Sequence, residues 1–171
     1  GAGGTIAGDI VAHAAPDGYT LFFQDITSHA INTALYNKLP YDSVKDFTPV
    51  TMINMTISTL IAKPGAPFNS VRELIEYARK YPGKVAYAST GIGSWQHLVG
   101  EWFAQHGWEM LHVPYKGLAP AMTALAAGQL DLVITNLATG LPFYKDGKVK
   151  MLALTQPSRF DALPELPAIT E

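Results

Sequence analysis

The sequence predicts an α/β fold with a mostly parallel sheet covered by helices on both faces. From Ser70 onward, short apolar segments typical of buried strands alternate with segments whose apolar residues recur at helical spacing. Hydrophobic residues make up 48% of the 171-residue chain and charged residues 15%, so the chain can bury a core. Its length suits one ordinary domain or two small lobes.

The N-terminal part is expected to combine two helices with strand-like segments. Pro16–Gly18 forms a turn signal after the first helix. The expected elements, in order, are a helix over Thr5–Ala14, a buried strand YTLFF over 19–23, a short helix over Ser28–Tyr36, and strand-like segments FTPVTMI over 47–53 and ISTLIA over 57–62. The sequence KPGAP that follows interrupts the pattern and predicts a boundary between Ala62 and Lys63.

The remainder alternates regularly. Ser70 and Glu73 form a capping-box pattern at the start of a helix that ends at Pro82-Gly83. After it, the pattern predicts a strand KVAYA (84–88), a helix from Trp95 to Gly107, a strand MLHV (110–113), a helix from about Pro120 to Gly128, a strand LDLVIT (130–135), a helix near Leu137–Lys145, a strand VKMLALT (149–155) and an irregular, proline-rich tail.

Composition excludes several classes of protein. The net charge is −2 and there is no cluster of Lys and Arg, so nucleic acid is not an expected partner. The chain has no cysteine, which excludes disulfides and thiolate zinc sites. No apolar run approaches the roughly 18 residues of a membrane span, and direct membrane insertion is not expected. The opening GAGGT, without methionine or signal peptide, suggests a mature or trimmed chain.

The stretch YASTGIGSWQHL raises the question of an anion site. It predicts a strand end, a small-residue loop and a helix start, where unpaired N–H groups and the helix dipole favour a carboxylate or phosphate. Gly91 and Gly93 permit close approach of a ligand, and Ser89, Thr90 and Ser94 add hydroxyl donors. The lysine of a nucleotide-binding loop is absent. The alternative is an ordinary strand-to-helix loop, and the residues leave both readings open.

Other predicted strand ends carry polar residues too. Asn136 has an amide able to read a polar ligand, or it caps a helix, and the two roles are compatible. The same alternatives hold for Asp25, Thr27 and Ser28, while GAGGT could form a second cradle of N–H groups. VPYKGLAPA belongs on the same sheet edge, where Tyr115 could form a wall and Lys116 add charge, although a solvated lysine and a packed tyrosine explain it as well.

Signals for enzyme chemistry are weak. There is no G-x-S-x-G elbow and no pair of acidic residues that stands out. The histidines show no i, i+4 metal pair and no carboxylate partner two to four residues away in a shared motif. His97 could meet the Ser89–Ser94 loop or simply pack on its helix. A Ser/His/Asp site assembled through space stays open as the minor alternative.

Several segments, in this order, resemble the Bug-type solute-binding proteins of tripartite tricarboxylate transporters. The most specific are PDGYTL, LPYD-x-VKDF and HVPYKG, and the similarity runs over essentially the whole chain. The resemblance implies a periplasmic binding protein-like fold of type II, with two lobes that close on a ligand. It also implies a periplasmic location, a membrane permease as partner, a small organic carboxylate as ligand, and neither cofactor, metal nor catalysis.

By this resemblance, residues 1–62 are part of lobe 1 and residues 63–171 are lobe 2, with the start and end of lobe 1 absent. Thr135 stands where many members have an acidic residue, which leaves the specific substrate open. A ligand-sensing role in a two-component system is the alternative within binding proteins. The residues expected to bind ligand are Gly3, Gly4, Thr5, Thr27, Ser28, Ser89, Thr90, Gly91, Gly93, Ser94 and Asn136.

Overall fold

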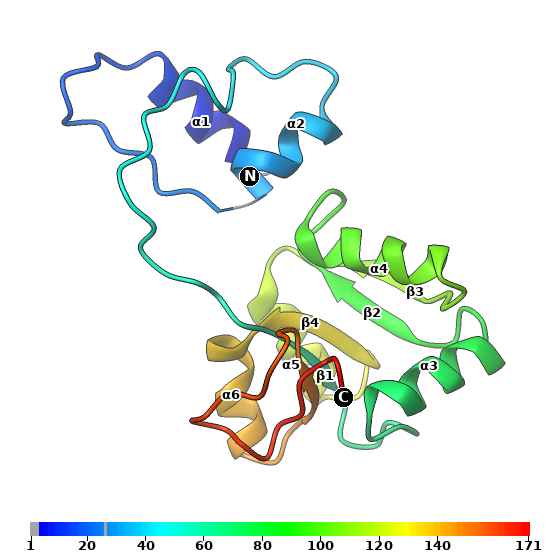
Figure 1. Cartoon of the computed structure of the whole chain (residues 1–171). Helices are drawn as coiled ribbons and strands as arrows, with labels where there is room; N and C mark the ends of the chain where they lie inside the picture. The colour runs from blue at the N-terminus through cyan, green and yellow to red at the C-terminus, as the bar shows by residue number, and fades with distance from the viewer. Residues whose placement is uncertain (1–3, 26) are drawn as a thin grey trace. The chain divides into compact units, whose positions relative to one another are not determined.

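The computed structural model describes residues 4–25 and 27–171 and divides the chain into two compact units, Gly1–Ile53 and Asn54–Glu171 (Figure 1). The division lies earlier in the chain than the predicted boundary between Ala62 and Lys63. The cause is the segment just before that boundary, which forms a strand inside the sheet of the second unit. None of the helices formed by the described residues combines the length and apolarity needed to cross a bilayer.

Short helices and an aromatic cluster make up the first unit. Its helices are α1 (Thr5–Ala12), the π-helix η2 (Thr27–Ile31) and α2 (Asn32–Leu35). The ring of Tyr41 is buried and meets Phe47 edge-on, with ring centroids 5.5 Å apart. A side chain at Gly8 of α1 would collide with the Tyr41 ring, so the glycine allows α1 to approach the cluster closely.

Two predicted strands of the first unit do not form. Residues 19–23 and 47–53 have no ladder partner, and Tyr19, Leu21 and Phe23 are 92%, 73% and 71% exposed. A strand is stabilised by a neighbour that pairs with its backbone N–H and C=O groups, and the described residues of this unit supply none. The prediction of buried strands was therefore wrong here. The two helices were confirmed near their expected positions.

The second unit is built on a five-stranded mixed sheet with the order β3-β2-β4-β1-β5. Its strands are β1 (Ser58–Ala62), β2 (Ala86–Ser89), β3 (Leu111–Pro114), β4 (Leu132–Asn136) and β5 (Lys150–Leu154). The strand β2 pairs in parallel with β3 and β4, whereas β1 runs antiparallel to both of its neighbours. Four of the five strands therefore share one direction, which refines the predicted mostly parallel sheet.

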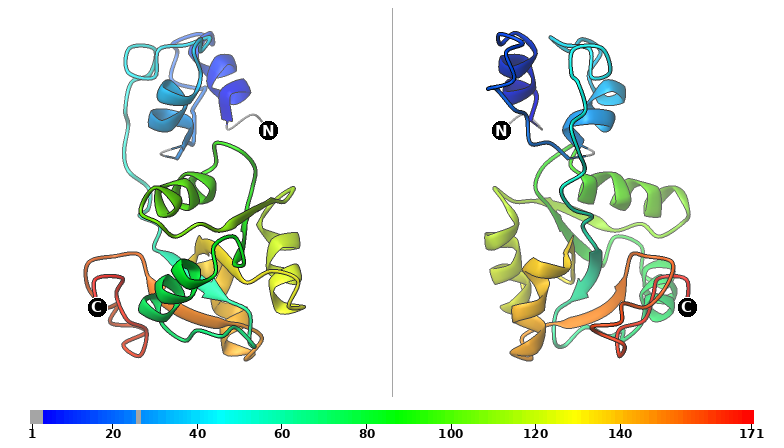
Figure 2. Two further views of the ribbon diagram at one scale, coloured as in Figure 1. Left: turned by 90° about the vertical axis from the view of Figure 1, so that its right-hand side faces the viewer. Right: turned by 60° about the vertical axis from the view of Figure 1, so that its left-hand side comes forward.

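Helices cover both faces of this sheet, as expected (Figure 2). They are α3 (Val71–Lys80), α4 (Trp95–Gln105), α5 (Leu118–Ala126) and α6 (Leu137–Lys145). On one face, α3 and α4 contribute Leu74 and Phe103 to a core cluster with Leu132. On the other, α5 and α6 contribute Met122 and Leu137 to a second cluster. Burial of one such side chain stabilises the fold by about 1.5–3 kcal/mol, so the alternating pattern fixes which face each helix covers.

Local signals define the start of α3. The Ser70 hydroxyl accepts a hydrogen bond from the Glu73 amide at 3.2 Å, as a capping box requires. The Glu73 carboxylate reaches back one residue further than expected and accepts from the amide of Asn69 at 2.7 Å. The Asn69 side chain in turn accepts from Lys150 at the start of β5, at 2.8 Å. This capped end therefore lies at the sheet edge where β5 begins.

An ion pair also stabilises that edge. Lys63 Nζ lies 2.7 Å from Asp131 Oδ1, and both side chains are largely buried. The other carboxylate oxygen of Asp131 accepts from the amide of Ala86 at 2.8 Å. The carboxylate thus connects the residue after β1 to the first residue of β2, at the start of β4.

A glycine sets the distance between α4 and the sheet. A side chain at Gly100 would collide with the buried ring of Tyr87 in β2. We expect Gly100→Ala to lower the free energy of unfolding by about 1–3 kcal/mol, because a ring held in a packed core cannot move aside. Denaturant unfolding measures the effect.

The matched control is Gly65→Ala, where the added methyl group meets nothing within 4 Å and the change should stay within about 0.5 kcal/mol. The Tyr87 hydroxyl, one of the atoms in the collision, is buried without a hydrogen-bond partner among the described residues. Adding Tyr87→Phe should therefore restore part of the loss. Wild-type stability in Gly100→Ala would contradict the close approach of α4.

Candidate ligand-binding site

The candidate site is the sheet edge at which β2, β3 and β4 end. Since these strands are parallel to one another, their carboxyl ends share one edge, and α4, α5 and α6 begin there (Figure 1). Ligands of open α/β sheets bind at this kind of edge. The structure thus brings together the Ser89–Ser94 loop, Tyr115 and Lys116 after β3, and Asn136 at the end of β4.

The first turn of α4 offers backbone donors. The amide of Ser94 donates to the carbonyl oxygen of Gly91 at 3.2 Å, and the amide of His97 donates to the Ser94 hydroxyl at 3.4 Å. Trp95 and Gln96 lie between them, and their amides have no protein partner in the described part of the chain. A helix start also carries about half a positive charge from the macrodipole. Two N–H groups are therefore left for an anion.

Glycines and serines shape the loop before this turn. Gly91 and Gly93 have φ angles of 124° and 82°, which favour glycine. The carbonyl oxygen of Gly91 accepts from the Ser94 hydroxyl at 2.7 Å, which closes the loop on itself. The Thr90 side chain is exposed and donates to Gln96 Oε1 at 3.4 Å. The loop is thus held by its own side chains.

The Ser89 side chain has a different place from the one expected. Ser89 is 1% exposed, and its hydroxyl lies 2.5 Å from His112 Nε2 and accepts from the amide of Gly91 at 3.0 Å. The prediction of an open hydroxyl donor at this position is therefore corrected: Ser89 supports the loop from within. The cause is the pairing of β2 with β3, which brings His112 beside it.

Two histidines, His97 and His112, support the loop. His97 Nδ1 accepts from the amide of Gly93 at 3.3 Å, and the rings of His97 and His112 lie 4.6 Å apart. His97 Nε2 also lies 3.5 Å from Glu101 Oε1. The expectation that no histidine has a nearby carboxylate partner was wrong, and the i, i+4 spacing of His97 and Glu101 was the available signal.

The environment of His112 makes its charged form unfavourable. Burial lowers the pKa of His112 below its usual value, His97 lowers it further, and Glu101 acts in the opposite direction. Between the ordinary value of 6.5 and this lower value, the unfolded chain binds a proton that the folded chain does not. The folded state therefore loses stability as the pH falls through that window.

Asn136 serves as the N-cap of α6. Its Oδ1 accepts from the amide of Thr139 at 2.8 Å, so the capping role is confirmed. The amide of Leu137 donates to the carbonyl oxygen of Ile57 at 2.8 Å. The side-chain nitrogen of Asn136 has no partner among the described residues and can still donate to a ligand. The neighbouring Thr135 is buried, and its hydroxyl likewise has no partner there.

The other predicted site residues belong to the first unit. Gly4 precedes α1 with a φ of 85°, and Thr5 is the first residue of that helix. Thr27 and Ser28 are the first residues of η2. Gly3 lies outside the described residues.

An apolar hollow of about 490 Å³ runs along α4 and begins at Trp95, one of the two residues with an unpaired amide. Its lining combines Trp95 and Trp102 of α4 with Ile134 of β4 and Ile169 of the C-terminal segment. Trp95 and Trp102 are 41% and 51% exposed. The hollow thus places apolar surface next to the first turn of α4.

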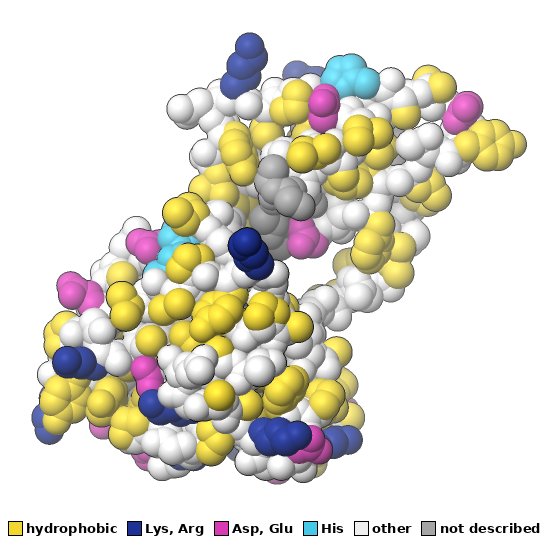
Figure 3. All heavy atoms as spheres, turned by 180° about the vertical axis from the view of Figure 1, so that it is seen from behind, with side chains coloured by type: hydrophobic (Ala, Val, Ile, Leu, Met, Phe, Trp, Pro, Cys, Tyr) yellow, Lys and Arg dark blue, Asp and Glu magenta, His cyan; other side chains and the backbone are white. Residues whose placement is uncertain are grey.

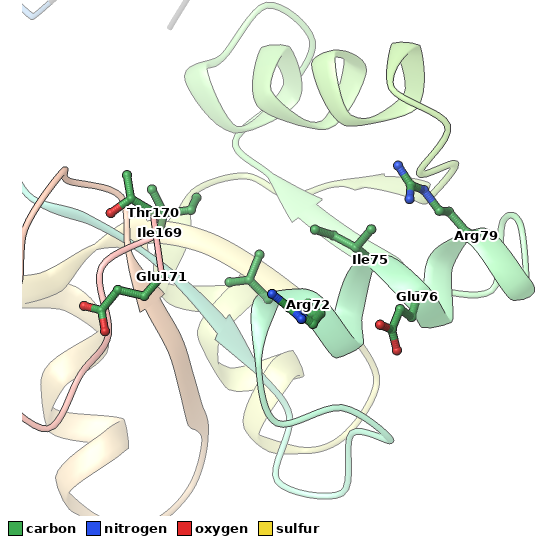
Figure 4. A pocket seen from close by; sticks show the side chains of 8 residues that line it. Arg72, Ile75, Glu76, Arg79, Ile169, Thr170 and Glu171 are labelled. Atoms are coloured by element: carbon green, nitrogen blue, oxygen red, sulfur yellow. The ribbon is translucent and has the colours of Figure 1, made fainter.

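A second hollow, of about 390 Å³, is less suited to an anion (Figure 4). Arg72, Glu76 and Arg79 of α3 line it together with Ile169, Thr170 and Glu171 of the C-terminal segment, so its lining carries charges of both signs. The Glu171 carboxylate pairs with Arg159 at 2.6 Å, and these hydrogen bonds lower the pKa of Glu171 to about 2. The hollow belongs to α3 and the tail, not to the loops that follow β2, β3 and β4.

Surface charge does not suggest a polyanionic partner. On the face shown in Figure 3, basic and acidic side chains lie interspersed, without a broad basic patch. This distribution agrees with the net charge of −2.

Comparison with known proteins gives a consistent family. The family model described as the tripartite tricarboxylate transporter family receptor matches residues 1–171. A protein from the tcbD-tcbE intergenic region of Pseudomonas sp. (strain P51) is 35% identical over 172 residues, which cover 100% of this chain and 51% of that protein. BugT of Bordetella pertussis is 32% identical over 173 residues, covering 100% and 53%. The chain spans about half the length of these relatives.

Solved structures of similar proteins agree with this family match. A protein of R. palustris determined with adipate has a TM-score of 0.89 at 37% identity, over 99% of this chain and 57% of that chain. MatC from Rhodopseudomonas palustris with bound malate has a TM-score of 0.83 at 32% identity, over 99% and 58%. The periplasmic binding protein BugD has a TM-score of 0.81 at 36% identity, over 99% and 56%.

The cap of α4 should be measurable as stability. We expect Ser94→Ala to lower the free energy of unfolding by about 0.5–2 kcal/mol, because it removes both the acceptor for His97 and the bond to Gly91. Ser94→Asp keeps a capping oxygen and should lose less. Thermal or denaturant unfolding gives the values, with Ser158→Ala in the exposed tail as the control. Equal values for Ser94→Ala and Ser158→Ala would exclude the cap.

Proposed function

The chain belongs to the tripartite tricarboxylate transporter family of receptors, as its resemblance to Bug-type proteins predicted, and we propose that it captures a small organic carboxylate. The neighbouring structures confirm the predicted periplasmic binding protein-like α/β fold. The family and these neighbours are binding proteins and not enzymes. Capture without chemical conversion is therefore the role that the structure has to explain.

The observation that carries the proposal is the pair of unpartnered amides on Trp95 and Gln96 at the carboxyl edge of the sheet. A carboxylate accepts two such bonds with its two oxygens, and the dipole of α4 adds to the attraction. The Asn136 side chain, at the end of the adjacent strand β4, supplies a further donor. Adipate and malate, bound in two relatives, belong to the same chemical class.

The remaining predicted residues extend the same proposal. Gly4, Thr5, Thr27 and Ser28 of the first unit would supply a second set of contacts, and the two units would correspond to parts of the two lobes. The family consists of periplasmic solute-binding proteins, so we expect a periplasmic location and a membrane permease that accepts the ligand. The apolar hollow along α4 would take the carbon chain of the ligand.

Proline at position 95 tests the backbone donor. Trp95→Pro deletes one amide hydrogen, while proline is well tolerated in the first helical position. Ser94, with φ −68° and ψ 158°, already has the extended conformation required before proline. Relative to Trp95→Ala, which also lacks the indole, we expect adipate to bind about tenfold more weakly, or ~1.4 kcal/mol.

The affinity is measured by calorimetric titration with adipate, in a full-length receptor of the family that contains this chain. Circular dichroism checks that α4 is intact in both variants. Equal affinities for Trp95→Pro and Trp95→Ala would remove the amide from the site.

Charge at Asn136 tests the second donor. Aspartate is as good an N-cap as asparagine, so Asn136→Asp should preserve α6 while placing a negative charge beside the ligand. We expect at least about a tenfold loss of adipate affinity, because like charges repel in a partly buried site. The control, Ser70→Asp, adds the same charge to the cap of α3 at the opposite sheet edge. Equal effects of the two substitutions would point to net charge alone and contradict a site at Asn136.

A further inference from the structure

The His97 and His112 rings lie at the base of the Ser89–Ser94 loop and connect three elements. His97 comes from the first turn of α4 and His112 from β3, and Ser89 of β2 lies against His112. The ring centroids of the two histidines are 4.6 Å apart. Neither histidine was among the residues expected to bind ligand, and neither belongs to the set of donors described above.

The hydrogen bonds of this cluster fix the protonation state of His97. The amide of Gly93 can only donate, so His97 Nδ1 must offer a lone pair to accept it. The remaining ring proton then lies on Nε2, which faces the Glu101 carboxylate at 3.5 Å. A protonated imidazole carries a hydrogen on both nitrogens and cannot accept this bond. The loop conformation therefore requires neutral His97.

The second glycine amide of the loop is held through His112. The amide of Gly91 donates to the Ser89 hydroxyl, which in turn contacts His112 Nε2. Either direction of the serine–histidine bond is compatible with this geometry, because a hydroxyl both donates and accepts. The contact of His97 with Gly93 therefore needs a ring nitrogen without a hydrogen, whereas the contact of His112 with Ser89 has no such requirement.

In the part of the chain that the structure describes, few charged or titratable groups face this pair of histidines. Glu101 approaches from α4, and Tyr87 approaches from β2 with its ring 5.1 Å from that of His112. Burial raises the pKa of Tyr87 to about 12, and Glu101 raises it further, so Tyr87 stays neutral. Burial and the neighbouring His97 lower the pKa of His112, and Glu101 acts in the opposite direction, so the net effect favours the neutral form of that ring.

We infer that neutral His97 is the positioning residue of the candidate carboxylate site, and that protonation of its Nδ1 releases Gly93 and loosens the Ser89–Ser94 loop. The inference rests on the proposed function. Trp95 and Gln96 directly follow this loop, so its conformation sets where their amides point.

The test compares two variants at position 97, one that keeps a hydrogen-bond acceptor for the Gly93 amide and one that lacks it. His97→Asn retains an oxygen close to the place of Nδ1 and has no proton to gain, whereas His97→Ala removes the acceptor. At pH 8, in a full-length receptor of the family that contains this chain, we expect adipate affinity to fall at least about threefold in His97→Ala and to stay within about twofold in His97→Asn. Gln105→Ala, at the exposed last residue of the same helix and away from the loop, is the control and should change nothing.

A readout without ligand separates this inference from the proposed function. The protection factor of the Gly93 amide, measured by hydrogen exchange between pH 8 and pH 5.5 and corrected for intrinsic rates, should fall in the wild type. It should stay constant in His97→Asn and be low throughout in His97→Ala. Constant protection of Gly93 in all three proteins would overturn the inference. Loss of protection in the wild type without any binding of adipate would uphold the role of His97 and reject the ligand class.

Discussion

The parallel pairing of β2 with both β3 and β4 is the constraint on which the candidate site depends. It makes three strands end at one edge, so that three helices start there with the positive ends of their dipoles. The strand β1 shows the alternative, because it runs antiparallel and its carboxyl end lies at the other edge. With β4 in that orientation, Asn136 would be separated from the Ser89–Ser94 loop by the length of the sheet.

Side chains at this edge are largely used for local structure. Ser94 and Asn136 cap their helices, Ser89 supports the loop from within, and His97 accepts from Gly93. Among the described residues, the donors left over at this edge are the amides of Trp95 and Gln96 and the side-chain nitrogen of Asn136, and exposed donors of this kind are hydrated by water when no ligand is bound. Replacing that water with a carboxylate exchanges neutral hydrogen bonds for charge-assisted ones, which are about twice as strong. Loop and caps thus prepare the donors before the ligand arrives.

The sequence predicted the second unit well because its signals are local. Ser70, Ser94 and Asn136 stand directly before apolar helical stripes, and each was found as a cap. The strand predicted at Tyr19–Phe23 failed because a strand depends on a partner that no local pattern reveals. The division into compact units also differs from the predicted boundary, since KPGAP resembles a linker but follows a strand that lies inside the sheet of the second unit.

The site was predicted in part for the same reason. Glycine and serine spacing identified the loop before α4, but the inward position of Ser89 depends on which residue of β3 lies beside it. The contact between His97 and Gly93 needs the turn that two positive φ angles create. Only the spacing of His97 and Glu101 could have been recognised in advance.

The proposed recognition by main-chain amides would have an evolutionary consequence. Nearly every amino acid carries the same N–H group, so substitutions at Trp95 and Gln96 would reshape the surroundings without erasing the proposed contact to a negative charge. Descendants of such a protein can diversify the organic part of what they recognise while inheriting the preference for acids. Relatives that share only about a third of their residues would therefore keep a preference for the same chemical class of ligand.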